Sequence, residues 1–296
     1  MRTMRDSFLS VLHGMMKKNE KIIFITADFG APKLDQIKND FPDRFFNVGI
    51  AEQNMINTAA GFALEGFTVY CYAIAAFITM RCYEQIRVNL AITSQLRKIN
   101  VNLVGVGAGF SYAVSGPSHH CLEDISIMST LPNVEVFSGS DPFIAECFAD
   151  YSQKKTGVKY FRFDSSPLPE IYSETLSPDL NLGFCELASG KDICVLSTGV
   201  QTGLVREKVK EMHKGHIDMF RLTDFNSEEL IQVLKNYKTI HCLEESFRGH
   251  GLDSILRTAL CDTNIKIVSR GCIKKYIFDL GTRDDLHKAS GAYIDL

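Results

Sequence analysis

Short apolar segments alternate with amphipathic segments along most of the chain, and this alternation restricts the possible folds. In the first half, segments typical of β-strands cover residues 22–26, 68–72, 101–106, 134–138 and 158–163. Between them, apolar residues recur at helical spacing over residues 4–18, 53–65, 78–92, 123–130 and 141–154. Strands separated by helices of this length can pair in parallel through right-handed crossovers. The pattern therefore predicts an α/β fold with a mostly parallel, doubly wound sheet.

The alternation stops at residues 166–181, a stretch that is rich in proline and serine and has little periodicity. Such a composition is typical of a linker. The alternation then resumes, with strands expected at 192–198, 216–221, 239–243 and 265–269 and helices at 201–213, 227–236 and 251–260. We therefore expect two doubly wound α/β domains, residues 1–165 and the smaller 182–296, joined by the linker 166–181.

Composition narrows the class of protein. The net charge is -3 and no long basic run occurs, so nothing indicates nucleic-acid binding. No apolar stretch approaches the roughly 18 to 20 residues that cross a bilayer, and Asp6 interrupts the start of the chain too early for a good signal peptide. The nine cysteines are isolated and lack metal-ligand spacing, which favours free thiols in a reducing compartment. We expect a cytoplasmic protein that supplies no metal ligands.

The most informative segment is FPDRFFNVGIAEQNMINTAAGFALEG, residues 41–66. It combines a strand, FFNV, with a turn through Gly49 and a helix that opens with AEQN. This segment resembles the transketolase and deoxyxylulose-phosphate synthase superfamily. The resemblance extends over nearly the whole chain and is strongest to the C-terminal subunits of split transketolases. It implies a pyrimidine-binding domain for thiamine diphosphate at residues 1–165 and a transketolase C-terminal domain at residues 182–296.

The resemblance assigns the central role in this motif to Glu52, with Ile50 beside it at the cofactor. In the family, this glutamate contacts nitrogen N1′ of the cofactor's aminopyrimidine. A carboxylic acid bonded there favours the imino form of the 4′-amino group, which is a competent base. To donate that bond Glu52 should be protonated, and a desolvated site favours the protonated form. The alternative is an ordinary glutamate at a helix start, where the helix dipole favours negative charge.

A second segment, YAIAAFITMRCYEQIRVNLA at residues 72–91, resembles the family's aromatic pattern. In relatives its phenylalanine, here Phe77, lies against the aminopyrimidine ring; the alternative is a core phenylalanine. Arg81 is expected near the cofactor or at a subunit contact. Asp28, in ITADFG, follows the first strand and corresponds to a cofactor-side turn of the family. Asp28 could equally cap that turn.

The loop GAGFSYAVSGPSHHCLEDI, residues 107–125, resembles the family's substrate loop. The resemblance implies that His119 lies over the reacting carbon and binds substrate hydroxyls, with His120 next to it. An imidazole can donate and accept protons near neutral pH. Ser115 stands where sugar-phosphate transketolases have an aspartate, and Gly107 where they have a histidine. Arg162 keeps one of two basic positions that relatives use for phosphate, so we expect a modified or nucleotide-linked sugar as acceptor.

The family binds the diphosphate and Mg2+ through a GDG motif, which does not occur in this sequence. We therefore expect an N-terminal transketolase subunit as partner, holding Mg2+ and sharing thiamine diphosphate in an alpha2beta2 heterotetramer that is active on sugar substrates. Open alternatives are the beta subunit of a 2-oxoacid dehydrogenase, a deoxyxylulose-phosphate synthase-like subunit and a non-catalytic regulatory paralogue. Glu244, Glu245 and His250, in LEESFRGHGL, are expected at an interface or in a structural role rather than in chemistry.

Overall fold

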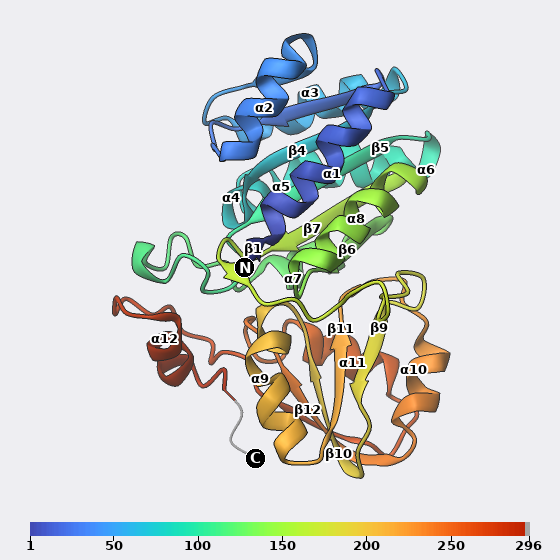
Figure 1. The fold of residues 1–296 in the computed structure, drawn as a ribbon, viewed down its shortest axis with the longest axis vertical. Helices are drawn as coiled ribbons and strands as arrows, with labels where there is room; N and C mark the ends of the chain where they lie inside the picture. The colour runs from blue at the N-terminus through green and yellow to red at the C-terminus, as the bar shows by residue number, and fades with distance from the viewer. Residues whose placement is uncertain (294–296) are drawn as a thin grey trace.

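The computed structural model describes residues 1–293 and contains two main β-sheets, which Figure 1 shows one above the other. The first sheet has six strands, all parallel, in the order β3-β2-β4-β5-β7-β6. These strands are β2 (Ile22–Thr26), β3 (Phe45–Asn47), β4 (Thr68–Ile74), β5 (Asn100–Val106), β6 (Val134–Ser138) and β7 (Gly157–Phe163). A separate antiparallel pair joins β1 (Arg2–Thr3) to β8 (Pro167–Leu168). The parallel sheet predicted from the alternation is confirmed.

Helices cover both faces of this sheet. On one face α1 (Met4–Lys18) and α8 (Pro142–Lys154) lie side by side and bury alternate strand residues such as Ile22 and Phe24 (Figure 1). The opposite face buries Ile23 and Ile25 under helices that include α3 (Glu52–Leu64). The other helical segments of this half are α2 (Pro32–Asp40), η1 (Pro42–Arg44), α4 (Ala75–Met80), α5 (Tyr83–Gln85), the π-helix η2 (Ile86–Ile92), α6 (Thr93–Leu96), η3 (Ala113–Ser115) and α7 (Asp124–Ser129).

One helical prediction in this half needs correction, and one helix was missed. The single helix expected at 78–92 is interrupted: α4 begins earlier, at Ala75, and the later part changes to π-helical bonding over η2. Helix α2 was not predicted, because Leu34 and Ile37 are its only buried residues and so small a set shows no periodicity. Pro32 begins this helix, at a position where a missing backbone N–H costs nothing.

The second sheet has five strands in the order β13-β12-β10-β11-β9. Its elements are β9 (Phe184–Ala188), β10 (Asp192–Ser197), α9 (Val200–Glu211), β11 (Gly215–Met219), α10 (Ser227–Leu234), β12 (Tyr237–Leu243), α11 (Leu252–Ala259), β13 (Lys266–Ser269) and α12 (Arg283–Ser290). Strand β9 runs antiparallel to β11 and was not predicted; the other pairs are parallel. Helix α12 was also not predicted, and a capping box of Thr282 and Asp285 begins it.

The segment 166–181 contacts both halves of the molecule. The backbone amides of Ile171 and Tyr172 donate to the Asp141 carboxylate at 2.6 and 2.7 Å.

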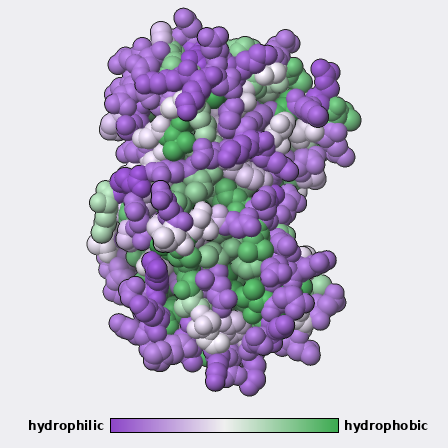
Figure 2. Space-filling model, turned by 45° about the vertical axis from the view of Figure 1, so that its right-hand side comes forward, coloured by the Kyte–Doolittle hydropathy of each residue, from purple (hydrophilic) through white to green (hydrophobic). Residues whose placement is uncertain are grey.

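One continuous cluster of buried apolar side chains includes residues of both sheets, from Ile23 to Leu260. Figure 2 shows apolar surface around the middle of the molecule, between more hydrophilic upper and lower parts. The domain limits at 165 and 182 stay a prediction, because two sheets that share a core do not by themselves define independent units.

All nine cysteines are free thiols, as predicted. Within residues 1–293, no helix is long and apolar enough to span a membrane. No group of three or more His, Cys, Asp or Glu side chains in the same range is arranged to hold a metal ion.

A buried carboxyl group between the halves leads to a pH prediction. Asp218, on β11, accepts hydrogen bonds from the hydroxyls of Ser140 (2.6 Å), Tyr172 (2.7 Å) and Thr202 (2.8 Å). Burial raises the pKa of this carboxyl from 3.8 to about 6, although the three donors counteract the effect. The folded state therefore keeps a proton that the unfolded chain releases. As the pH rises from about 4 to about 6.5, the unfolding free energy of the wild type should fall by roughly 2 to 3 kcal/mol more than that of Asp218→Asn. Urea unfolding at both pH values measures this difference; parallel pH profiles would contradict it.

Candidate functional site

A cavity of about 340 Å³ lies where the first sheet changes its winding direction. Strands β2 and β4 are neighbours in the sheet. The connection after β2 leads to β3 on one side, and the connection after β4 leads to β5 on the other side. Ligands of parallel sheets bind at such crevices, beyond the carboxyl ends of the strands. The lining residues are Ala27, Asp28, Phe29, Ile50, Glu52, Ala73, Ile74, Phe77, Arg81 and His119. An adjoining open cavity of about 590 Å³ shares Ile50, Glu52 and Arg81 with it.

Glu52 is the first residue of α3 and its side chain is buried, with 4% exposed. The chain turns from β3 into this helix through Gly49, whose φ of 74° lies in the left-handed region that glycine adopts without strain. Arg81 Nη1 donates a hydrogen bond to Glu52 Oε1 at 2.9 Å. Within residues 1–293, no hydrogen bond reaches the other oxygen, Oε2. One carboxylate oxygen is therefore held, and the other is left for a further partner.

Phe77 lies in α4, immediately beyond β4, and its ring is half-buried. The Arg81 guanidinium, one helical turn later, lies 3.7 Å from the centre of that ring. The His119 imidazole meets the same ring edge-on, with ring centres 5.3 Å apart. Phe77 thus lines the cavity while its inner side packs against a small buried cluster, and the structure brings it together with Glu52, Arg81 and His119.

Asp28 and Ile50 lie at the rim of the cavity. Asp28 is exposed and has a φ of 53°, in the left-handed region that aspartate tolerates. Its carboxylate accepts a hydrogen bond from Asn47 Nδ2 at 3.0 Å, and its amide donates to Asn47 Oδ1 at 3.1 Å. Ile50 is 74% exposed, unusually high for an isoleucine. Both positions face solvent at the sheet edge, where a ligand or another chain could cover them.

The loop 107–125 brings only one of its predicted site residues to the cavity. His119 lines it, with Nδ1 3.1 Å from the Ser118 hydroxyl. His120 is buried beside Phe110, with ring centres 5.1 Å apart, and burial lowers the pKa of its imidazole. Ser115 is exposed in η3 and does not line the cavity.

Arg162 is placed away from the cavity, against the expectation that it binds substrate. Its side chain is 4% exposed, Nε donates to Asp124 Oδ2 at 2.7 Å, and Nη2 donates to the backbone carbonyl of Glu245 at 3.1 Å. Burial opposes the charge, but the neighbouring Asp124 raises the pKa of this guanidinium above its ordinary value. The guanidinium is occupied inside the protein, so this geometry does not support a role in substrate binding.

One residue that lines the cavity and one that holds its rim were missed in the sequence. Phe29 lines the cavity and stacks on Tyr72 with ring centres 5.1 Å apart. Asn47, the last residue of β3, bonds to Asp28 and accepts a hydrogen bond from the Gly49 amide at 3.0 Å. Phe29 comes shortly after β2, and Asn47 ends β3. Asp28 was selected because it follows the end of a strand, and the same criterion could have selected these two residues.

Comparisons with known proteins identify the family of the chain. Residues 1–159, more than half of the chain, match the family described as transketolase, pyrimidine binding domain. One of the subunits of the apulose-4-phosphate transketolase of Actinobacillus succinogenes is 27% identical, over 99% of this chain and 94% of that protein. The 6-deoxy-6-sulfo-D-fructose transketolase subunit SqwH of Clostridium sp. strain MSTE9 is 30% identical, over 67% of this chain and 60% of that protein.

A solved structure described as a split gene transketolase, inactive beta4 tetramer, has the same fold. It superimposes with a TM-score of 0.87 at 26% identity and covers 98% of this chain and 94% of that one. The chain therefore belongs to the transketolase pyrimidine-binding family, and over nearly its whole length it is similar to the separate subunits of split transketolases.

Proposed function

We propose that this chain is one subunit of a thiamine diphosphate-dependent transketolase that transfers a two-carbon ketol unit from a ketose donor to an aldose acceptor. The observation that carries the proposal is the cavity in which the buried carboxyl group of Glu52, the ring of Phe77 and the imidazole of His119 meet. The family match over residues 1–159 supports it.

These groups fit the pyrimidine half of thiamine diphosphate. When bound, that cofactor supplies a nucleophilic carbon for cleaving the carbon–carbon bond beside a ketone. Phe77 offers an aromatic face on which a heteroaromatic ring stacks favourably. Glu52 would hold a proton at the pyrimidine nitrogen N1′, and its buried side chain lines the cavity beside Phe77. Asp28 and Ile50 would border the cofactor at the rim.

Arg81 adds a condition to this mechanism. Its guanidinium lies 3.7 Å from the centre of the Phe77 ring and donates to Glu52 Oε1 at 2.9 Å. A pyrimidine that stacks on this face of Phe77 would therefore require Arg81 to move away. The Arg81 side chain is 43% exposed, so it has room to turn towards solvent or towards another chain.

His119 is the residue of the loop best placed to handle the sugar. It lines the cavity and contacts Phe77, and an imidazole can both donate and accept protons near neutral pH. His119 would bind substrate hydroxyls and move a proton at the reacting carbon. His120, buried against Phe110, would support the loop, and Ser115 would reach substrate only from the loop's exposed tip.

A second chain would complete the site. The GDG motif does not occur in the sequence, and one similar protein was solved as an inactive beta4 tetramer. Several apolar residues near the cavity and along the following helices are exposed: Ile50 (74%), Met80 (40%), Val88 (39%), Ile92 (46%) and Leu96 (80%). Such a surface suits a subunit interface. We infer that a cytoplasmic N-terminal subunit contributes Mg2+ and the diphosphate contacts in an alpha2beta2 assembly.

The acceptor we propose is a modified or nucleotide-linked sugar. Arg162 is buried away from the cavity, and Arg81 is the only arginine or lysine that lines it within residues 1–293. Recognition of a terminal phosphate favours arginine or lysine on the oxygens. One relative is named for a sulfo sugar, 6-deoxy-6-sulfo-D-fructose, and another for a sugar phosphate, apulose 4-phosphate.

The test is reconstitution with a GDG-containing chain encoded by a neighbouring gene. Calorimetry with thiamine diphosphate and Mg2+ should detect binding to the mixture and at least about tenfold weaker binding to either chain alone. The mixture should then transfer ketol units to modified aldoses more efficiently than to unmodified sugar phosphates.

Each result has a contrary outcome. A mixture that binds cofactor but transfers nothing would indicate a non-catalytic paralogue. Turnover of pyruvate or another 2-oxoacid would favour one of the alternative enzyme classes. Full efficiency with ordinary sugar phosphates would overturn the proposed acceptor.

A further inference from the structure

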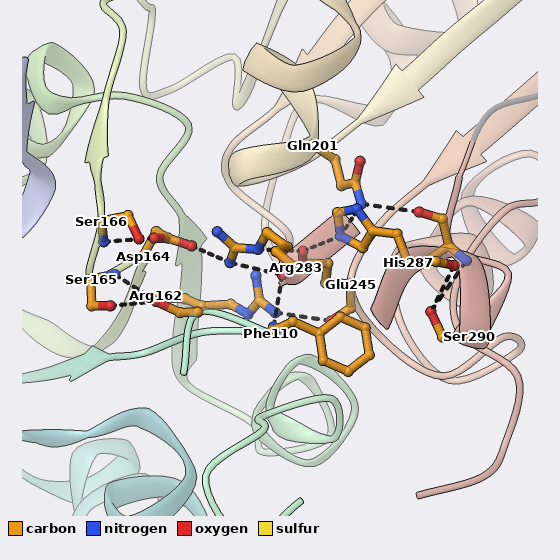
Figure 3. Close-up of polar contacts among 12 residues, drawn as sticks. Phe110, Arg162, Asp164, Ser165, Ser166, Gln201, Glu245, Arg283, His287 and Ser290 are labelled. Atoms are coloured by element: carbon orange, nitrogen blue, oxygen red, sulfur yellow. Dashed lines mark hydrogen bonds and ion pairs between the residues drawn. The ribbon is translucent and has the colours of Figure 1, made fainter. Parts of the chain in front are cut away.

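A buried carboxylate outside the cavity contacts the base of the loop that carries His119. Glu245 follows β12, and its side chain is 2% exposed. The amide of Phe110 donates to Glu245 Oε2 at 2.9 Å across 135 residues of sequence. Figure 3 shows Glu245 between Phe110 on one side and Arg283 and His287 on the other. The carboxylate thus joins the second sheet to the loop.

Helix α12 holds this carboxylate in place. Arg283 contacts both oxygens, Oε1 at 2.8 Å and Oε2 at 3.1 Å, and His287 Nε2 lies 2.5 Å from Oε1. Arg283 also pairs with Asp164, just beyond the end of β7 (Figure 3). Burial opposes the charge of Glu245, but Arg283 and His287 hold the pKa of its carboxyl down at about 2. Glu245 is therefore a fixed anion at neutral pH, with partners on both oxygens.

The loop approaches this anion closely through a glycine. Gly109 has a φ of 58°, and a Cβ atom there would lie 1.9 Å from Glu245 Oε2. Gly109 and Cys121 exchange backbone hydrogen bonds at 3.0 and 2.9 Å, which closes the loop directly after His119 and His120. Gly109 therefore holds Cys121, the residue that directly follows the two histidines.

We propose that Glu245 is a positioning residue for sugar binding. Its carboxylate anchors the base of the 107–121 loop and so sets the position of His119, and Arg283 and His287 hold the Glu245 carboxylate in its orientation. This inference rests on the proposed function, because the loop matters for catalysis only if His119 contacts the sugar. It gives the second half of the chain and its last helix a part in the active site, where the sequence indicated only a structural or interface role.

The experiment uses the reconstituted complex with two variants that disturb the contact from opposite sides. Glu245→Gln keeps the size of the side chain and removes its charge; Gly109→Ala introduces a side chain against the carboxylate. Displacement of a substrate-contacting group by about 1 Å can cost on the order of 10²-fold in rate. For both variants we expect kcat/KM for the ketose to fall about 10- to 100-fold. The Kd of thiamine diphosphate should stay within about twofold, because Glu52 and Phe77 lie on other elements.

A matched control separates positioning from loss of stability. Arg221 pairs with Glu135 at 3.4 Å, is 7% exposed and also joins the two halves, but it makes no contact with the loop. Arg221→Met should destabilise the fold and leave kcat/KM close to the wild-type value. Hydrogen exchange provides a readout that does not depend on turnover. The amides of residues 109–121 should exchange at least about tenfold faster in both loop-contact variants and at the wild-type rate in Arg221→Met.

Equal kinetic losses in Arg221→Met and Glu245→Gln would overturn the proposal, as would unchanged exchange across the loop. A loss of cofactor affinity that parallels the loss of kcat/KM would also overturn it. If Glu245→Gln fails to fold, Gly109→Ala tests the same contact with the α12 partners intact. A wild-type complex without ketose turnover would overturn the proposed function. Hydrogen exchange of the Phe110 amide, compared between wild type and Glu245→Gln, would still decide whether Glu245 anchors the loop.

Discussion

Replacing Glu52 by glutamine is expected to reduce ketol transfer by the reconstituted enzyme by about 10²- to 10⁴-fold, the range typical of lost acid–base catalysis. The amide has nearly the same shape as the buried acid but cannot exchange a proton with the pyrimidine nitrogen. Steady-state kinetics on ketose donors measures the effect. Calorimetry should show that thiamine diphosphate still binds to the variant complex, because Phe77 and the partner's contacts remain.

A neighbouring glutamate is the control for this substitution. Glu84, in α5, is exposed and lies outside the lining of the cavity. Glu84→Gln should therefore leave kcat and KM close to their wild-type values. Full activity of Glu52→Gln would mean that Glu52 only begins α3, where a helix dipole favours an acidic residue, and the proposed mechanism would fail.

Replacing Arg162 by methionine should destabilise the fold strongly, by about 3 to 5 kcal/mol of unfolding free energy. The substitution leaves Asp124 as a buried carboxylate whose side chain is fully inaccessible. The Tyr160 hydroxyl still donates to Oδ2 at 2.8 Å, but within residues 1–293 no cation remains beside the carboxylate to replace Arg162. Urea denaturation measures the loss.

A second variant tests the cause of that loss. Adding Asp124→Asn to Arg162→Met removes the uncompensated charge, so the double variant should recover part of the stability. A substrate-binding arginine would behave differently: its loss would raise KM for the sugar and leave the unfolding free energy nearly unchanged. That outcome would restore the expectation drawn from the sequence.

One candidate site residue was selected by its place after a strand, and the others by resemblance. Asp28 follows β2, and the carboxyl ends of parallel strands meet at one edge of a sheet. Glu52 and Phe77, selected by resemblance, lie at the same edge because they come shortly after β3 and β4. Within the loop, resemblance selected residues that the structure places apart. His119 lines the cavity, but His120 packs behind it and Ser115 remains at the exposed tip. In a loop, neighbouring side chains point in directions that no regular period determines.

By itself, the sequence determined the alternation of strands and helices and the parallel sheet, because local periodicity encodes them. Its motifs also resembled a family in which the counterparts of Glu52, Phe77 and His119 share one site. Only the tertiary structure decided the surroundings of Arg162 and Glu245. Arg162 finds Asp124 across 38 residues, and Glu245 finds Phe110 across 135. A buried charge is stable only where such partners surround it, and those partners become neighbours only after the chain has folded.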